Sequence, residues 1–401
     1  MFWANRPVFA VENNRSQKMK KIVIVVDSFK GSMDSLEAGH AARRGIERVY
    51  GKEVEIVVKP VADGGEGTMR AVTAGLGGTY VTLKVTGPFG SEVEASYGIV
   101  AERGLAVMEM AEASGITLVG QSGLDPASAT TYGVGEMILD AVKRGCRDFI
   151  MGIGGSATTD GGVGMLSALG YEFLDETGAP ILPGAAFLDR IARIRSDKVP
   201  AVLRECRFRI ACDVKNPLLG EQGAVYVYGP QKGVKEEERE LYDRKMAHYA
   251  EKTRDFTGKD MRTKEGAGAA GGLGFALLSY LDAVLEPGIS LVLGILEMEE
   301  EFRTADVVVT GEGRMDAQTA MGKVPVGIAR LAKKYDCGVL AFVGGATRDA
   351  VECNGAGIDA FFPIVRGIST LEEAMLKDNA EANMEDTAEQ VFRLVRMKNT
   401  L

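Results

Sequence analysis

Phe149-Ile-Met-Gly-Ile-Gly-Gly-Ser-Ala-Thr-Thr-Asp-Gly-Gly162 is the stretch that best indicates how this chain folds. Its apolar start is typical of a buried strand, its centre is a glycine-rich loop, and residues 163–169 continue as a helical pattern. Strand, loop and helix in this order are typical of α/β proteins with parallel strands. The loop also offers backbone N–H groups at the positive end of a helix, so it predicts an anion site.

The same alternation of short β-branched runs and helical patterns recurs toward both ends of the chain. Strands are predicted at 22–26, 54–58, 307–310, 339–343 and 361–365, and helices at 35–50, from about 66, at 371–375 and at 381–396. Apolar strands separated by helices favour one parallel sheet that joins the N-terminal and C-terminal segments.

The middle of the chain has a different pattern. Residues 81–85, 92–100 and 105–110 are strand-like and are separated by Gly-Pro and Arg-Gly turns, which favours an antiparallel meander. A helix at 133–144, the opening segment and a strand at 208–212 complete this region.

The predicted fold class is therefore α/β with two domains. Residues 19–78 and 291–401 would form a flavodoxin- or Rossmann-like parallel sheet, and residues 79–290 an inserted mixed α/β domain. Residues 1–18 lack the apolar core and cleavage site of a signal peptide, and we expect a disordered extension or an expression artefact.

Composition excludes several classes of function. The chain has 401 residues, 46% of them hydrophobic, with 47 basic and 56 acidic residues and a net charge of −9. This charge argues against a nucleic-acid-binding surface, which needs a basic stripe. No apolar run approaches the length of a membrane span.

Cysteine and histidine usage narrows the chemistry further. The five Cys residues show no CxxC spacing, which favours free thiols in the cytoplasm over disulfides or a zinc site. Only two His residues occur, His40 and His248, and both fall in helical patterns where a structural or solvated role is expected. Any general base is therefore predicted to be a carboxylate.

Four further loops resemble the opening one, because each follows an apolar strand directly and is polar, often with several glycines. They are Asp27-Ser-Phe-Lys-Gly31, Ala62-Asp-Gly-Gly-Glu-Gly67, Asp213-Val-Lys-Asn-Pro-Leu-Leu-Gly220 and Gly311-Glu-Gly-Arg-Met-Asp-Ala-Gln-Thr319. Ligands of open α/β sheets bind at the carboxyl ends of strands, so we expect these loops to share one site.

The residue types in these loops suit phosphoryl transfer, which uses a cation on the moving phosphoryl group and carboxylates for Mg²⁺ and the acceptor hydroxyl. Lys30 is the candidate cation, although a solvated lysine at a helix start is the simpler alternative. Asp160, Asp213, Glu312 and Asp316 are the candidate carboxylates, each of which could instead be only a helix N-cap.

Two patterns in the sequence resemble nucleotide-binding motifs of other protein classes, and each departs from its motif. Gly152-x-Gly154-x-x-Ala157 fits the dinucleotide fingerprint, with Glu172 and Asp175 near the distance of a ribose contact. It lies in mid-chain, however, and its acids fall in a strand-and-turn pattern. Gly322-Lys323 is followed by valine, so no Walker A motif is present there. A nicotinamide-dependent hydroxy-acid dehydrogenase and a non-catalytic small-acid binding protein remain as alternatives.

With these residues assembled, the chain resembles the bacterial glycerate kinases with a split α/β architecture. The resemblance covers residues 19–395 and rests on the four loops above together with Met110-Ala-Glu-Ala-Ser-Gly115, Thr130-Thr-Tyr-Gly133 with Glu136, Gly154-Gly-Ser-Ala-Thr158 with Asp160-Gly-Gly162, and Cys212-Asp-Val with Asn216-Pro-Leu218. Two places depart from the pattern, the extension 1–18 and Thr159, where the resemblance leads us to expect Asn.

The resemblance implies phosphorylation of D-glycerate by ATP with Mg²⁺, in a cleft between a flavodoxin-like domain and a mixed α/β domain. It favours 2-phosphoglycerate over 3-phosphoglycerate as product. It also implies a cytoplasmic enzyme whose partners are small molecules, with no nucleic acid and no membrane, and it leaves monomer and homodimer open. Which domain holds the nucleotide also stays open.

The predicted site follows from the loops and the resemblance together. Lys30, Asp316 and Asp213 are predicted as catalytic, with Asp316 positioning the acceptor hydroxyl and Asp213 the alternative for that role. Asp160, Asp213 and Glu312 are the predicted metal ligands. Substrate or phosphate contacts are predicted at Ser28, Asp63, Gly64, Gly65, Glu66, Gly154, Gly155, Ser156, Thr158, Asn216, Gly311 and Arg314.

Overall fold

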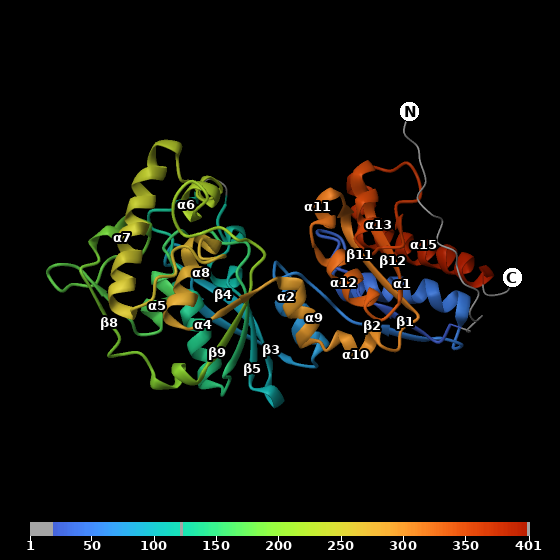
Figure 1. Ribbon diagram of the computed structural model, residues 1–401, viewed down its shortest axis with the longest axis horizontal. Helices are drawn as coiled ribbons and strands as arrows, with labels where there is room; N and C mark the ends of the chain where they lie inside the picture. Colours follow the sequence, from blue (N-terminus) through green and yellow to red (C-terminus); the bar gives the residue numbers. More distant parts are fainter. Residues whose placement is uncertain (1–18, 121–122, 399–401) are drawn as a thin grey trace.

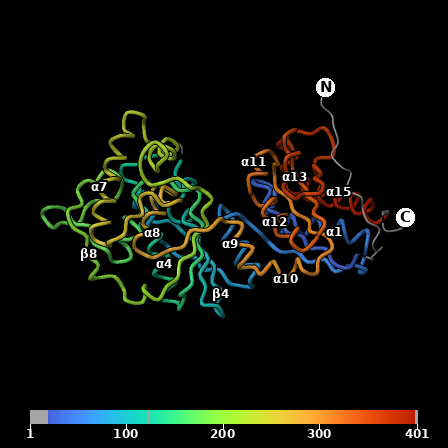
Figure 2. Tube along the Cα trace, viewed as in Figure 1, coloured from blue at the N-terminus to red at the C-terminus, as the bar shows by residue number. Residues whose placement is uncertain are grey.

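A computed structural model describes residues 19–120 and 123–398 of the chain. The predicted extension at 1–18 lies outside the described residues. In the described residues the strands form two large sheets with helices on their faces and one two-stranded pair, which confirms the predicted α/β class. Segments from the two ends of the chain lie in one lobe and the middle of the chain lies in the other (Figures 1 and 2).

The first sheet has five parallel strands. Their order is β13 (Ala360–Pro363), β12 (Gly338–Ala346), β11 (Val307–Met315), β1 (Lys21–Ile24) and β2 (Glu55–Val58). From β1 the chain moves outward to β2, whereas from β11 it moves outward in the opposite direction to β12 and β13. The strand order therefore reverses between β1 and β11, and such a reversal is where open α/β sheets bind ligands.

One face of this sheet is covered by α1 (Ser35–Tyr50) and α15 (Lys377–Lys398), which pack against each other. Asp34 caps α1 and forms a capping box with Glu37. An ideal Cβ on Gly45 of α1 would lie 2.0 Å from the Glu385 carbonyl oxygen, so only glycine permits this close approach of α15. Small and apolar residues of both helices, among them Ala41 and Met384, are fully buried against the sheet.

The opposite face carries α12 (Val324–Lys333), α9 (Gly288–Ile295) and α10 (Met298–Phe302). The shorter helices α11 (Ala317–Ala320), α13 (Glu352–Gly355) and α14 (Leu371–Met375) lie near the carboxyl ends of the strands. One strand differs from its prediction. β11 does not end at Thr310 but continues to Met315, because it stays paired with β12 as far as Ala346.

The second sheet has six strands. Their order is β10 (Val284–Glu286), β9 (Arg207–Ala211), β6 (Asp148–Gly152), β5 (Leu105–Glu109), β4 (Glu92–Val100) and β3 (Thr79–Thr86). The pairs β10–β9, β9–β6 and β6–β5 are parallel, whereas the pairs β5–β4 and β4–β3 are antiparallel. The predicted meander is therefore confirmed as the antiparallel edge of a mixed sheet.

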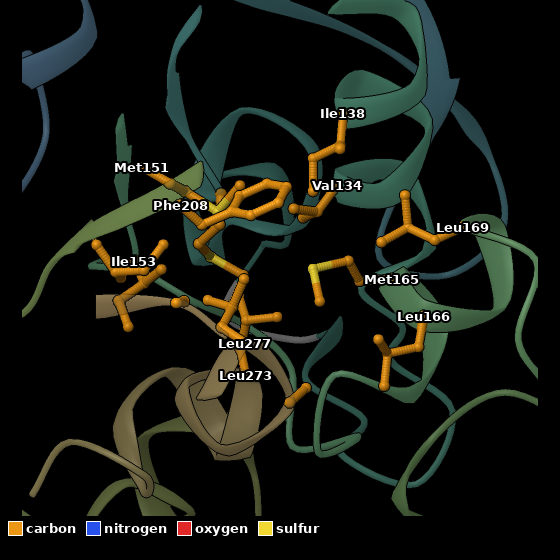
Figure 3. Packing of buried hydrophobic residues seen from close by; sticks show 14 of the residues in the cluster. Val134, Ile138, Met151, Ile153, Met165, Leu166, Leu169, Phe208, Leu273 and Leu277 are labelled. Atoms are coloured by element: carbon orange, nitrogen blue, oxygen red, sulfur yellow. The ribbon is translucent and has the colours of Figure 1, made fainter. Parts of the chain in front are cut away.

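The helices of this lobe are α3 (Ala111–Ser114), α4 (Tyr132–Lys143), α5 (Val163–Ala168), α6 (Ala224–Tyr228), α7 (Arg239–Thr257) and α8 (Ala269–Tyr280), with a small β7 (Glu172–Leu174) and β8 (Arg193–Arg195) pair beside them. Val134, Met165, Phe208 and Leu273 show how α4, α5, β9 and α8 meet in one buried core (Figure 3).

The two sheets share apolar contacts through α2 (Thr68–Gly75) and α9, which lie between the lobes (Figure 1). Met69 and Val292 of these helices belong to one buried cluster with Val23 of the first sheet and Ile150 of the second. The predicted domain boundary at residue 290 falls inside α9. The boundaries therefore stay a prediction. Among the described residues, no helix combines the length and apolarity that a bilayer crossing requires.

Candidate active site

Two carboxylates lie on either side of the point where the strand order reverses. Asp27 follows β1, and its N–H donates to the carbonyl of Gly311 on β11 at 2.9 Å. Glu312 is the next residue of β11, and its carboxylate accepts a hydrogen bond from the Thr319 hydroxyl at 2.6 Å. An ideal Cβ on Gly311 would lie 1.9 Å from the Phe342 carbonyl oxygen, so the predicted site glycine serves close strand packing.

Asp63, from the loop after β2, is the carboxylate that links this pair to the second sheet. Burial, followed by the charge of Asp63, raises the pKa of Asp27 to about 7, and Glu312 adds to this shift. Burial also raises the pKa of Glu312, with smaller contributions from Asp316 and Asp63. The pKa of Asp213, which follows β9, is raised by burial and by Asp63 as well. The charge of Asp63 thus acts on each of the other three carboxylates, and the four residues Asp213, Asp63, Asp27 and Glu312 are together called the carboxylate row.

Close backbone packing fixes the loop that carries Asp63. Gly64 has a φ of +94°, and an ideal Cβ there would lie 2.4 Å from the Cβ of Ala211 at the end of β9. An ideal Cβ on Gly152 of β6 would lie 2.4 Å from the Gly64 carbonyl oxygen, and one on Gly288 would lie 1.5 Å from that of Asp63. Glycine at each contact lets a loop of the first sheet sit against strand ends of the second.

Hydrogen bonds hold the same region in place. The N–H of Gly64 donates to the Thr68 hydroxyl, and the N–H of Gly65 donates to Oδ1 of Asp63. Asp213 accepts a hydrogen bond from the N–H of Gly288 at 2.9 Å. Glu109, at the end of β5, accepts one from the N–H of Met69 in α2 at 2.7 Å, and burial raises the pKa of Glu109 to about 7.

Cavities open on both sides of the carboxylate row. The larger, of about 1100 Å³, is lined by Asp63 and Asp213 and by cationic side chains that include Lys323 and Arg330. The smaller, of about 490 Å³, is lined by Asp27 and Glu312 together with the predicted residues Ser28, Lys30 and Arg314. The structure thus brings predicted residues from four of the five loops to these two cavities.

The fifth loop, at 152–162, contributes less than expected. Gly154 and Gly155 are exposed, whereas Ser156 and Thr158 are buried. The Nζ of Lys232 donates to the Ser156 hydroxyl at 2.7 Å and to the Thr158 carbonyl at 2.6 Å. Both residues thus hold an interior lysine, and their predicted phosphate contacts stay a prediction.

Asp160 also differs from its prediction. Its carboxylate is fully buried and accepts hydrogen bonds from the Thr131 N–H and hydroxyl, both at 2.8 Å, and from the N–H groups of Gly162 and Gly164, both at 3.1 Å. Both oxygens are occupied by these donors. These contacts fix the start of α5 and give Asp160 a structural role, and its predicted role as a metal ligand stays a prediction.

Asp316 and Asn216 turn toward their own loops. Oδ1 of Asp316 accepts hydrogen bonds from the N–H groups of Gln318 and Thr319, so this residue caps α11. The amide of Asn216 donates to the Gln222 carbonyl and accepts from the Tyr228 hydroxyl. Glu66 is exposed, and neither cavity is lined by it.

Two residues that matter were absent from the predicted site. Asp27 opens the Asp27-Ser-Phe-Lys loop, and its position directly after a buried strand is the signal that could have placed it there. Lys232 is fully buried, and burial lowers its pKa to about 7 while Asp160 opposes that shift. Its flanking sequence, Pro230-Gln-Lys-Gly233, is typical of an exposed turn, so the sequence did not indicate that this lysine is buried. In the described ranges, no group of three or more His, Cys, Asp or Glu side chains is arranged to hold a metal ion.

Comparison with known proteins matches this architecture. A model of the glycerate kinase family covers residues 22–396. A glycerate kinase of Halalkalibacterium halodurans is 44% identical over 89% of this chain and 94% of its own length. A glycerate 2-kinase of Escherichia coli strain K12 is 43% identical over 88% of this chain and 93% of its own length.

A solved structure agrees in three dimensions. The crystal structure of a protein provisionally described as glycerate kinase 2, from Salmonella typhimurium LT2, superposes with a TM-score of 0.88. It is 39% identical and covers 96% of this chain and 100% of its own. The resemblance found in the sequence is thereby confirmed, and this chain belongs to the glycerate kinase family, a family of phosphotransferases that act on a hydroxyl group.

Proposed function

We propose that this protein transfers the γ-phosphoryl group of ATP to D-glycerate and forms 2-phosphoglycerate. The observation that carries the proposal is the carboxylate row at the strand-order reversal, with one cavity on each side of it. Two cavities that meet at one row of carboxylates suit a donor and an acceptor that react with each other. The E. coli relative is described as a glycerate 2-kinase, which favours the 2-hydroxyl as acceptor.

Mg²⁺ fits the donor set of the row. Asp27, Glu312 and Asp63 offer only carboxylate oxygens, the ligands that Mg²⁺ prefers. Burial, followed by the charges of Asp63 and Glu312, raises the pKa of Asp27, and a divalent cation would stabilise the charged carboxylate there. Since the described carboxylates form no ready-made three-ligand site, we propose that Mg²⁺ enters with the ATP phosphates and takes one or two of these carboxylates as ligands. When bound, the ion would offset negative charge on the phosphate oxygens.

Lys30 and Arg314 would bind the phosphoryl group. Both side chains are exposed on the wall of the smaller cavity, beside Asp27 and Glu312. Their charge is the local attraction that an anionic substrate needs on a protein with a net charge of −9. The exposed backbone of Gly154 and Gly155 would offer N–H groups to the glycerate carboxylate.

Asp213 would accept the proton of the glycerate hydroxyl. It lines the larger cavity, and its raised pKa makes it a stronger base than an ordinary aspartate. In the reaction the hydroxyl oxygen bonds to the γ-phosphorus, the bond from that phosphorus to the β,γ-bridging oxygen breaks, and ADP leaves. Asp316 is engaged as a helix cap, which favours Asp213 over it for this role.

The test is ATP consumption with and without D-glycerate, measured on the wild type and on Lys30→Ala. Wild-type ATP consumption should depend on glycerate, and Lys30→Ala should lower kcat by about two orders of magnitude or more. Lys52→Ala is the matched control, because Lys52 is exposed and contacts no described partner by hydrogen bond or ion pair. Glycerate-dependent reduction of a nicotinamide would favour a dehydrogenase, and binding without turnover would favour a binding protein.

The protein is proposed to act in the cytoplasm on these small molecules. All five cysteines are free, and four of them are buried. Free thiols are typical of a reducing compartment.

A further inference from the structure

The smaller cavity has an apolar wall that glycerate does not explain. The wall comes from the segment after β13, from α14 and from α15, and consists of Ile364, Val365, Leu371, Ala374, Met375 and Ala380. Glycerate carries an oxygen on each of its three carbons and has little apolar surface to bury. An adenine ring has two flat apolar faces, which gain free energy when they leave water.

The floor of the same cavity is bare backbone. It is formed by Gly313, Gly344 and Gly345 at the carboxyl ends of β11 and β12. An ideal Cβ on Gly344 would lie 2.4 Å from the Gly313 carbonyl oxygen, so these strands approach closely. An ideal Cβ on Gly345 would meet nothing within 4 Å, so this position faces open space. A lining without side chains leaves room for a planar ring to approach the backbone.

Asn383 of α15 is the polar group within the apolar wall. It lines the cavity and is half-buried, and no described residue forms a hydrogen bond with its amide. An amide presents one acceptor and two donors side by side. This pattern matches the N6 amino group and the N7 atom of adenine.

Other side chains that line the same cavity are charged. Asp27, Lys30, Glu312 and Arg314 line it, so a nucleoside on the apolar wall would direct its phosphates toward the carboxylate row. The larger cavity, with Asp213 and several cations, is then left for the small anionic acceptor. One cavity thus offers apolar side chains for a base and charged side chains for phosphates and their metal ion, at the reversal of strand order.

We propose that the smaller cavity binds the adenine nucleoside of ATP and that Asn383 selects adenine by hydrogen bonds to the edge of the base. The inference rests on the proposed function, because it assigns the place of the phosphoryl donor. It puts the nucleotide on the five-stranded sheet and glycerate toward the six-stranded sheet.

The first test fills the cavity without a backbone clash. Gly345→Val places a β-branched side chain in a strand, in the open space above the floor. Titration calorimetry should show about tenfold weaker binding of ADP or more, while inorganic tripolyphosphate, which has no base, binds as before. The control is Gly355→Val, because Gly355 is exposed at the end of α13 and an ideal Cβ there also meets nothing within 4 Å.

The second test concerns the base. Asn383→Ala should raise the KM for ATP by about tenfold, narrow the preference for ATP over GTP, and leave the KM for glycerate within about twofold. Gln390→Ala, an exposed change on the same helix, should change neither constant.

Failure of the inference is distinct from failure of the proposed function. If the wild type makes no phosphoglycerate, the proposed function fails, and ADP binding to Gly345→Val still reports on the cavity. If the wild type turns over and Gly345→Val binds ADP as tightly as the wild type, the inference is overturned. An Asn383→Ala effect on the KM for glycerate alone would overturn it as well.

Discussion

Replacement of Asp27 by Asn should stabilise the fold above neutral pH while it removes activity. Burial and the neighbouring carboxylates raise the pKa of Asp27 from 3.8 to about 7. A shift of roughly three pKa units corresponds to about 4 kcal/mol of penalty on the charged form, at about 1.4 kcal/mol per unit. Asparagine keeps an oxygen that can accept the hydrogen bond from the N–H of Ser28 and carries no charge.

The sign of the pH dependence follows from the two pKa values. The folded-state pKa lies above the unfolded one, so the contribution of Asp27 is most favourable below pH 3.8 and is lost as the pH rises through about 7. The stability gap between Asp27→Asn and the wild type should therefore widen by about 3 kcal/mol between about pH 5 and about pH 8.

Urea unfolding at the two pH values measures this gap, and an ATP-consumption assay measures the loss of activity. Glu221→Gln is the matched control, because Glu221 is exposed and no described residue forms a hydrogen bond or ion pair with it. Its stability should follow the wild type at both pH values. A gap for Asp27→Asn that stays constant or narrows with rising pH would refute the account of the carboxylate row.

Four further predictions follow from neighbouring contacts. Burial is the main cause of the raised pKa of Asp27, and Asp63→Asn removes the larger of the two charges that add to it. The acidic limb of the kcat/KM profile should therefore move to lower pH by about one unit, and an unmoved limb would contradict the coupling. Asp160→Ala leaves four hydrogen-bond donors without their acceptor and should lower the free energy of unfolding by about 3–5 kcal/mol, as measured by urea unfolding. A loss under about 1 kcal/mol would count against a structural role for Asp160. The pKa of Lys232 falls from 10.5 to about 7 on folding, so the unfolded chain binds more protons between these values and wild-type stability should rise from about pH 7 to about pH 10. Lys232→Met should flatten this rise, as measured by urea unfolding. An equal slope in both proteins would disprove the burial of a neutral lysine. Gly64→Ala places a Cβ 2.4 Å from the Cβ of Ala211, at a φ of +94° that disfavours alanine. The free energy of unfolding should fall by about 2 kcal/mol and kcat should fall with it. Wild-type values of both would argue against close packing of this loop.

Much of the fold could be predicted because buried parallel strands are continuous runs of β-branched residues. Residues 22–26 are such a run, and β1 lies there at Lys21–Ile24. The extension of β11 through Gly311, Glu312 and Gly313 could not be predicted, since this composition is typical of a loop. Pairing with β12 as far as Ala346 supplies the hydrogen bonds that keep these residues in the sheet.

The site residues could be predicted where their position depends only on which loops follow the strands. Lys30, Asp63 and Glu312 line the cavities because parallel strands end at the same edge of a sheet. The direction of side chains within a loop is set by distant contacts instead. Asp160 turns inward because Thr131, from another segment, donates to it, and no local pattern in the sequence encodes that contact.

The central claim is that the carboxylate row joins a nucleotide to glycerate at its 2-hydroxyl. Phosphorus NMR of a reaction that contains the protein, D-glycerate, ATP and Mg²⁺ tests it most directly. The account predicts that the γ-phosphate signal of ATP declines while those of ADP and 2-phosphoglycerate grow together, and that Asp27→Asn produces neither. A 3-phosphoglycerate signal would contradict the assigned hydroxyl. Inorganic phosphate as the sole new phosphorus product beside ADP, or full turnover by Asp27→Asn, would contradict the claim itself.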